Sequence, residues 1–255
     1  MDSVFSLLTP IEFSAAFAIA LLGGLIKGMV GFALPMIMIS GLSMFLAPDL
    51  ALASLISATV VTNGIQALRH GGAAAWASVR RFRLFLVVGG LFLVTSAQLV
   101  PYLRQEVFLL VLGVPVTFFA LLQLFGWTLH LNGQSARADT LFGMMAGAIG
   151  GMSGVWGPPT VLYLTAMNTP KAEQVRIQGV VYGLGALALV VAHTGSGVLR
   201  SETWPLSLAL VVPALAGALV GTRIQDRIDQ VTFRKVTLIV LTLAGLNLIR
   251  RGLFG

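Results

Sequence analysis

Gly24 to Pro35 (GLIKGMVGFALP) and Gly147 to Pro158 (GAIGGMSGVWGP) are the two stretches that decide how this chain is organised. A shift of 123 residues aligns them, with identical residues at six of twelve positions. The same shift pairs His70 with His193. One ancestral half has therefore been used twice, and each copy carries an apolar segment that glycines and a proline interrupt.

The composition places both stretches in a membrane. The chain has 255 residues, of which 57% are hydrophobic and 10% are charged, and its mean hydropathy is +0.93. These values exclude an ordinary soluble domain. The apolar residues come in runs of about 17–25, the length that a helix needs to cross roughly 30 Å of hydrocarbon. In polytopic membrane proteins, interrupted segments at matching positions of two halves point to a transport site.

The charged residues and the missing cysteines exclude other classes. Lys and Arg exceed Asp and Glu by seven, but they lie almost wholly in loops that flank the apolar runs, so nucleic-acid binding is not indicated. The absence of cysteine excludes disulfides and thiolate metal sites. The N-terminal residues MDSVFSLLTPIEF lack the positive region of a cleaved signal peptide, so we expect the first span to be retained.

We predict an all-α polytopic membrane protein built from two inverted repeats. Residues 1–127 form the first transmembrane repeat, 128–138 a cytoplasmic connector, and 139–255 the second repeat. Each repeat has one broken or re-entrant segment and three full transmembrane helices. The broken segments are 11–46 and 139–168, a loop covers 69–83, and the full helices lie near 50–68, 84–100, 106–127, 174–194, 204–222 and 235–250.

The basic residues favour re-entrant broken segments. If each segment crosses the membrane once, the basic residues divide almost evenly between the two sides. If each broken segment returns to its starting side, eleven basic residues lie on one side of the membrane. The positive-inside rule makes that side cytoplasmic. The halves are then inverted, and their breaks meet near the midplane. The eleven are Arg69, Arg80, Arg81, Arg83, Arg137, Lys171, Arg176, Arg223, Arg227, Arg234 and Lys235.

The residues after each break suit an anion. Pro35 and Pro158 each fit the first turn of a new helix, where the missing N–H would be unpaired anyway. The free N–H groups and positive dipole end of such a helix start can bind an anion without a formal charge. Glycines would let the backbone approach that ligand closely. In the alternative reading, the prolines only kink structural helices. The glycines are Gly28, Gly31, Gly154 and Gly157.

Lys27 lies inside an apolar run, directly before the first break. A lysine within the membrane is a functional candidate by default because burying an ammonium group is costly. Its repeat counterpart is Gly150, so the predicted site is asymmetric. The alternative is that Lys27 extends to the membrane surface.

The carboxylates support an anion rather than a cation. All nine Asp and Glu residues lie at segment ends or in loops, whereas cation and proton pathways usually bury such groups. Proton coupling would then need His70, His193 or the substrate itself. Metal ions and cofactors are not predicted.

Neutral polar residues within the predicted helices complete the candidate site. Asn63 and Gln66 share one helix face, as do Gln178 and Tyr182. Trp156 lies in the second break and would wall the site. The polar pairs could donate to substrate oxygens, or they could only link helix to helix.

An enzyme is the alternative outside transport. Gly151 to Gly154 (GMSG) resembles the serine motif of rhomboid intramembrane proteases, and His193 could pair with Ser153. The spacing of these glycines recurs as Gly28 to Gly31, where valine replaces serine, so the spacing belongs to the repeat. The motif is weak without its structural context.

Two halves that each open with a G-x3-G-x2-G break and a proline-led helix resemble the TauE/SafE sulfite exporter family, also called the 4-toluene sulfonate uptake permease family. Residues 147–164 (GAIGGMSGVWGPPTVLYL) are especially similar to its second-half signature. The resemblance implies secondary transport of sulfite, sulfonates or related anions across the plasma membrane. Substrate and direction stay open because the family contains exporters and importers, and the first half reads GFALP at 31–35 where GxGGG is common.

These observations together predict a multi-pass transporter of a small sulfur-containing anion in the bacterial inner membrane, working by alternating access. A passive anion channel is the alternative within transport. A homo-oligomer is left open.

Overall fold

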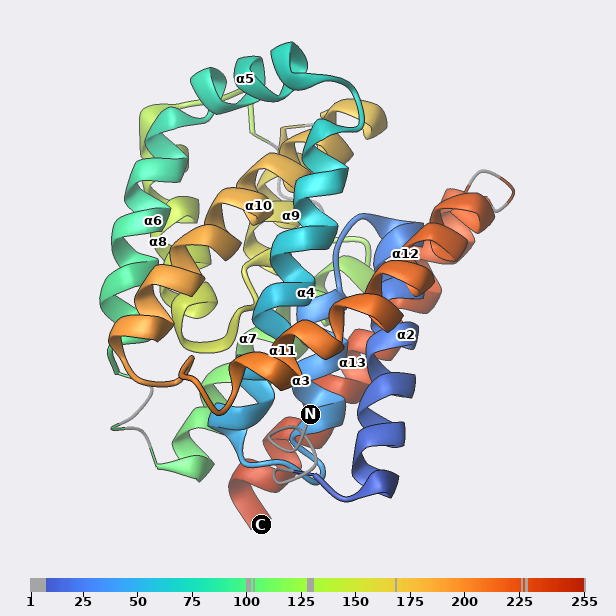
Figure 1. Ribbon diagram of the computed structural model, residues 1–255. Helices are drawn as coiled ribbons and strands as arrows, with labels where there is room; N and C mark the ends of the chain where they lie inside the picture. The colour runs from blue at the N-terminus through green and yellow to red at the C-terminus, as the bar shows by residue number, and fades with distance from the viewer. Residues whose placement is uncertain are drawn as a thin grey trace.

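The structure is a computed structural model that describes residues 8–99, 102, 104–127, 131–167, 169–225, 227 and 229–254. These residues form helices and turns, with no β-strand among them, and the all-α prediction is confirmed. Most helices run side by side in one bundle, and α5 lies across its end (Figure 1). The helices are α2 (Pro10–Val30), α3 (Leu34–Leu42), α4 (Pro48–Leu68), α5 (Gly72–Arg81), α6 (Arg83–Ala97), α7 (Gln105–Leu124), α8 (Ala136–Ser153), α9 (Gly157–Ala166), α10 (Lys171–Gly195), α11 (Trp204–Ala209), α12 (Val211–Gln225) and α13 (Gln230–Phe254).

Several helices are long and apolar enough to cross a membrane. Within the described residues, these spans are Pro10–Val30, Pro48–Leu68, Glu173–Gly195 and Trp204–Ile224. Arg83–Ala97 and Leu109–Leu124 are shorter apolar helices. This arrangement confirms a polytopic membrane protein.

The two breaks have the same local structure. α2 ends at Gly31 and α8 ends at Gly154, and both glycines adopt the left-handed conformation, with φ of 83° and 69°. Each donates its N–H to the carbonyl four residues earlier, at 2.7 Å in both cases, which closes the last helical turn. After each break a short helix begins with a proline in its first turn. The predicted interruptions are therefore confirmed.

The two halves interleave rather than pack as separate units. α2 packs on α12 of the other half, and α8 packs on α6 in the corresponding way, while α4 pairs with α10 and α7 with α13. Small residues make these contacts possible. A Cβ on Gly24 would lie 2.0 Å from the Ala214 carbonyl oxygen, and one on Gly147 would lie 2.1 Å from that of Gly89. Gly24 and Gly147 therefore let the helix backbones approach closely.

One predicted element was wrong, and another has a local interruption. Residues 72–81, expected in a loop, form the helix α5, where the Arg80 guanidinium lies 5.6 Å from the centre of the Trp76 ring one turn earlier. The predicted helix 204–222 corresponds to the apolar span Trp204–Ile224, with a local interruption at Leu210 between α11 and α12. Pro213 has no N–H to donate to the Ala209 carbonyl, so the helical hydrogen-bond series is interrupted there.

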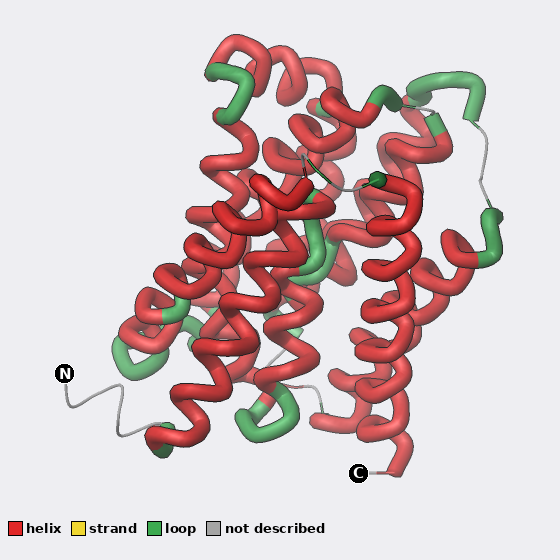
Figure 2. The backbone as a smooth tube through the Cα atoms, turned by 90° about the vertical axis from the view of Figure 1, so that its right-hand side faces the viewer, coloured by secondary structure: helices red, strands yellow, loops and turns green. Residues whose placement is uncertain are grey.

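One end of the bundle gathers arginines. Arg81, at the end of α5, pairs with Glu173 at the start of α10, and its Nε donates to the Gln134 carbonyl oxygen Oε1 at 3.2 Å. Arg176 donates to the Ser78 hydroxyl at 3.1 Å. These contacts join α5, the segment before α8 and the start of α10 at one end, which we call the basic end. α2 begins and α13 ends at the opposite end (Figure 2).

Candidate functional site

The two breaks meet at one small enclosed cavity. Residues 32, 33, 35 and 36 of the first half and 154–157 of the second half line it, together with Lys27, Asn63 and Tyr182. The starts of α3 and α9 therefore face the same space, as the repeat predicts. The cavity has about 10 Å³ of free volume, which is about the space that one water molecule needs. In this conformation the two breaks are closed around each other.

Lys27 is buried at the inner end of this cavity, with 3% of its surface exposed. Its ammonium group donates to the side-chain oxygen of Asn63 and, at 2.9 Å, to that of Gln66. Both partners are neutral amides from α4. Lys27 has no carboxylate partner among the described residues. With this burial the Lys27 side chain does not extend to a membrane surface, which was the alternative interpretation of its position.

Gln66 and Gln178 form a second polar layer beside Gly31. Gln66 Nε2 donates to the Val175 carbonyl oxygen at 3.0 Å, which ties α4 to α10. Gln178 Oε1 is buried and has no hydrogen-bond partner within the described part of the chain. A Cβ on Gly31 would lie 2.8 Å from that oxygen, so only glycine leaves this space open. Gln178 therefore presents an unused polar atom next to the first break.

Trp156 and Tyr182 wall the cavity on its other side. Their ring centres are 6.2 Å apart, and both side chains are buried. The Tyr182 hydroxyl donates to the Gly157 carbonyl oxygen at 3.3 Å, which fixes the ring against the start of α9. A Cβ on Gly150, the repeat counterpart of Lys27, would lie 2.7 Å from the Trp156 ring. In the first half this position carries the Lys27 side chain, whereas in the second half the Trp156 ring packs over Gly150 at the equivalent position.

A larger cavity leads from Lys27 toward the basic end. It has a volume of about 310 Å³, and Lys27, Gly31 and Gln66 line its inner part. Arg69 and Arg223 line it as well, and both are exposed, so the cavity reaches the surface where they lie. Three basic side chains from three helices therefore line one route to the site. Sequence reasoning placed both arginines in loops on one side but gave no reason to join them to Lys27.

The candidate glycines serve different purposes. Gly28 lines the larger cavity, but a Cβ there would lie 2.2 Å from the Ala218 carbonyl oxygen, so its small size is needed for the contact with α12. Gly154 faces Leu55, and a Cβ on Gly157 would lie 3.3 Å from the Phe32 ring. Gly154 and Gly157 also line the small cavity.

The two candidate histidines lie away from both cavities. His70 lies in the exposed turn after α4. His193 is buried, and its ring nitrogens lie 2.9 Å from the Gly151 carbonyl oxygen and 3.2 Å from the Ser196 hydroxyl. Both ring nitrogens are therefore within hydrogen-bond distance of neighbouring groups, one on α8 and one in the turn after α10. Ser153 ends α8, but its side chain lies outside the described residues. No cluster of metal-ligating side chains occurs in the part of the chain that the structure describes.

Comparison with protein-family models matches residues 16–248 to the family described as Sulfite exporter TauE/SafE. This chain belongs to the TauE/SafE family. The match covers nearly the whole chain, so the protein is a membrane transporter with a small anionic substrate, and the predicted resemblance is confirmed. TauE/SafE is a transporter family and not an enzyme family, so the intramembrane protease alternative was wrong. No curated protein and no solved structure matches the chain.

Proposed function

We propose that this TauE/SafE protein is a secondary transporter that moves sulfite, an organosulfonate or a related small sulfur-containing anion by alternating access. The observation that carries the proposal is Lys27, a buried ammonium group at the junction of the two breaks whose hydrogen-bond partners among the described residues are amide oxygens. A buried charge without an opposite charge is costly. A bound anion would supply that charge.

The chemistry around Lys27 favours an oxyanion. The helix starts of α3 and α9 point positive dipole ends at this region, and Met36 and Gly157 from these starts line the same cavity as Lys27. Pro35, Pro158 and Pro159 have no N–H, so the first turns offer the backbone N–H groups of Leu34 and Met36 in α3 and of Gly157 in α9. A sulfite or sulfonate group has three oxygens that can accept such donors from several directions. The proposed substrate-binding residues are Lys27, Gly28, Gly31, Asn63, Gln66, Gly154, Trp156, Gly157, Gln178 and Tyr182.

The route to the site supports alternating access. The larger cavity reaches the basic end beside Arg69 and Arg223. Toward the opposite end, α3 packs Met36, Met38 and Leu42 in the buried core. The site is thus open to one end and covered toward the other, as one state of an alternating transporter would be. Transport then requires α3, or α9 in its place, to move relative to the rest of the bundle.

We further propose that the halves are inverted and that the basic end is cytoplasmic, in the bacterial inner membrane. The directions of corresponding helices support the inversion, because α2 begins at the end opposite the basic end (Figure 2) whereas α8 begins at the basic end, where Gln134 contacts Arg81. The gathering of Arg69, Arg81, Arg176 and Arg223 at one end supports the orientation through the positive-inside rule.

Cysteine labelling would test this orientation directly, because the chain has no cysteine of its own. Arg80→Cys lies on exposed α5 at the basic end, and Arg200→Cys lies in the exposed turn after α10. We expect a membrane-impermeant maleimide added outside cells to label the Arg200→Cys variant and not the Arg80→Cys variant until the membrane is opened. The reverse pattern would overturn the orientation, and labelling of both from outside would overturn the arrangement of the helices.

Uphill accumulation would separate a transporter from a passive anion channel. In proteoliposomes with an imposed proton or sodium gradient, we expect labelled sulfite or an organosulfonate to accumulate above its external concentration. Sulfite, sulfoacetate, a taurine-like sulfonate and a carboxylate of similar size should be compared in parallel. Equilibration without accumulation under every gradient would favour the channel. Preference for the carboxylate would contradict the proposed substrate class.

A further inference from the structure

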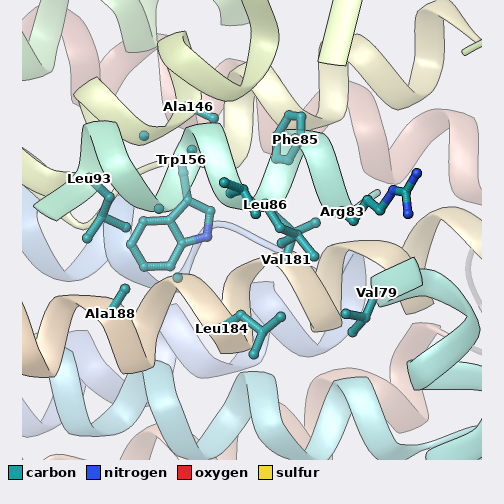
Figure 3. Close-up of a pocket in the computed structure, with 15 residues that line it drawn as sticks. Val79, Arg83, Phe85, Leu86, Leu93, Ala146, Trp156, Val181, Leu184 and Ala188 are labelled. Carbon is teal, nitrogen blue, oxygen red and sulfur yellow. The ribbon is translucent and has the colours of Figure 1, made fainter. Parts of the chain in front are cut away.

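A second cavity, separate from the Lys27 route, lies between α6, α8 and α10 (Figure 3). It has a volume of about 330 Å³ and is lined almost wholly by apolar side chains and glycine, among them Phe85, Leu86, Leu93 and Val181. Trp156 forms part of its wall and also lines the small cavity of the breaks. We call this cavity the apolar groove.

The apolar groove occupies the place in one half that the Lys27 cavity occupies in the other. Helices α8, α10 and α6 correspond to α2, α4 and α12 under the repeat. The polar residues of the Lys27 cavity are absent from the matching positions: Gly150 replaces Lys27, Gly185 replaces Thr62, and Leu189 replaces Gln66. The groove therefore has no buried group that would bind a small inorganic anion. Its chemistry suits a hydrocarbon chain.

The apolar groove opens sideways on the bundle. Val87 is 70% exposed and Leu184 is 41% exposed, and both line the groove. In a spanning bundle, exposed valine and leucine side chains on α6 and α10 face lipid rather than water. The hydrocarbon that can reach the groove is therefore an acyl chain of the surrounding bilayer.

The length of the groove matches one leaflet. Its lining on α6 runs from Arg83 to Leu93, which spans about 15 Å at the rise of an α-helix. Half of the hydrocarbon core of a bilayer is also about 15 Å. An acyl chain that starts at the basic end would therefore end near Leu93 and Trp156.

Arg83 gives the groove a charged entrance. It is exposed at the start of α6, at the basic end, and lines the groove. Among the described residues it has no ion-pair or hydrogen-bond partner, whereas its neighbour Arg81 pairs with Glu173. Basic side chains at a membrane surface attract anionic phospholipid head groups. The free guanidinium is therefore available to a lipid phosphate.

From these observations we propose that the apolar groove binds one acyl chain of an anionic phospholipid, with Arg83 contacting the phosphate and Trp156 contacting the inner part of the chain. The ligand belongs to the leaflet at the basic end. Because Trp156 also walls the substrate cavity, a bound lipid would hold that wall in place. This last effect rests on the proposed transport function, but lipid binding does not.

Fluorescence quenching at Trp156 would test the binding. The chain has four tryptophans, so Trp76, Trp127 and Trp204 are first replaced by phenylalanine. The protein is then placed in nanodiscs with phosphatidylglycerol or phosphatidylcholine that carries bromine on its acyl chains. We expect stronger quenching by the phosphatidylglycerol at equal mole fraction. Equal quenching by the two lipids would overturn the proposed head-group contact.

Two variants make the assignment specific. Arg83→Gln should lower the preference for phosphatidylglycerol about fivefold, while Arg80→Gln, a matched loss of charge at the same end, should leave it within twofold. Gly90→Leu should reduce quenching by both lipids, because Gly90 lines the groove and has open space for a side chain. Unchanged quenching in Gly90→Leu would show that no chain enters the groove.

Two further measurements separate this proposal from the transport site. Lys27→Met should leave the quenching unchanged, so failure of the substrate assignment would not affect the lipid result. Addition of a soluble alkyl sulfonate should also leave it unchanged. Displacement of the brominated lipid by that sulfonate would assign the groove to the transported substrate and overturn the lipid proposal.

Discussion

Lys27→Met should reduce sulfite or sulfonate transport to the level of empty liposomes, with the protein still inserted and folded. Methionine keeps much of the length and apolar character of the side chain and removes the charge. Loss of one partner of a buried charged pair costs about 2–5 kcal/mol, so we expect anion affinity to fall at least about 30-fold. The measurement is flux in proteoliposomes, together with binding by isothermal titration calorimetry.

Controls distinguish the charge from the fold. Lys235→Met removes a lysine from an exposed position on α13 and should leave transport unchanged. Asn63→Asp places a carboxylate on the Lys27 ammonium and should also abolish anion binding, because the new carboxylate supplies the opposite charge itself. Normal flux in both Lys27→Met and Asn63→Asp would remove Lys27 from the site.

Gly147→Val should destabilise the protein strongly. A Cβ at this position would lie 2.1 Å from the Gly89 carbonyl oxygen and 2.9 Å from the Gly89 Cα, and neither backbone atom can move without separating α8 from α6. Forcing extra atoms into a packed contact typically lowers the free energy of unfolding by about 1–3 kcal/mol. A clash with backbone atoms should cost an amount near the upper end of this range. We expect the apparent Tm in detergent to fall on the order of 5–10 °C.

Gly90→Val provides the matched control. Gly90 also lies on α6, but no heavy atom comes within 4 Å of the position that a Cβ would take. The change should therefore leave the apparent Tm within about 2 °C. Equal loss of stability in the two variants would show that glycine flexibility, and not the close contact of α6 with α8, explains the glycine at position 147.

The sequence was sufficient to locate the two breaks because their signals are local. A left-handed glycine at the end of a helix and a proline at the start of the next are readable within a few residues, as at Gly31 and Pro35. Lys27 was a candidate for the same reason, since its surroundings in the chain are apolar. These local features do not depend on how the other helices pack.

The remaining features depend on contacts between distant segments. Only the placement of α12 beside α2 explains why Gly28 packs on Ala218. The same placement explains why Arg223 shares a cavity with Lys27 and Arg69. The helix α5 was missed because Gly71, Gly72 and the arginines around it are typical of a loop. Ala33 was missed as well: it adopts a φ of 86°, which non-glycine residues rarely do, immediately before the start of α3.

The exchanged pairing of α2 with α12 has a consequence for biogenesis. α2 ends at Val30, but its main partner begins at Val211, so ribosomes must add about 180 residues before the two can meet. At typical synthesis rates this takes roughly 10–40 s. During that interval the close-packing face of α2, with Gly24 and Gly28, is exposed to lipid or to an insertase. A chaperone for nascent membrane proteins would therefore be expected to act on this first helix, and truncation before Val211 should leave it prone to degradation.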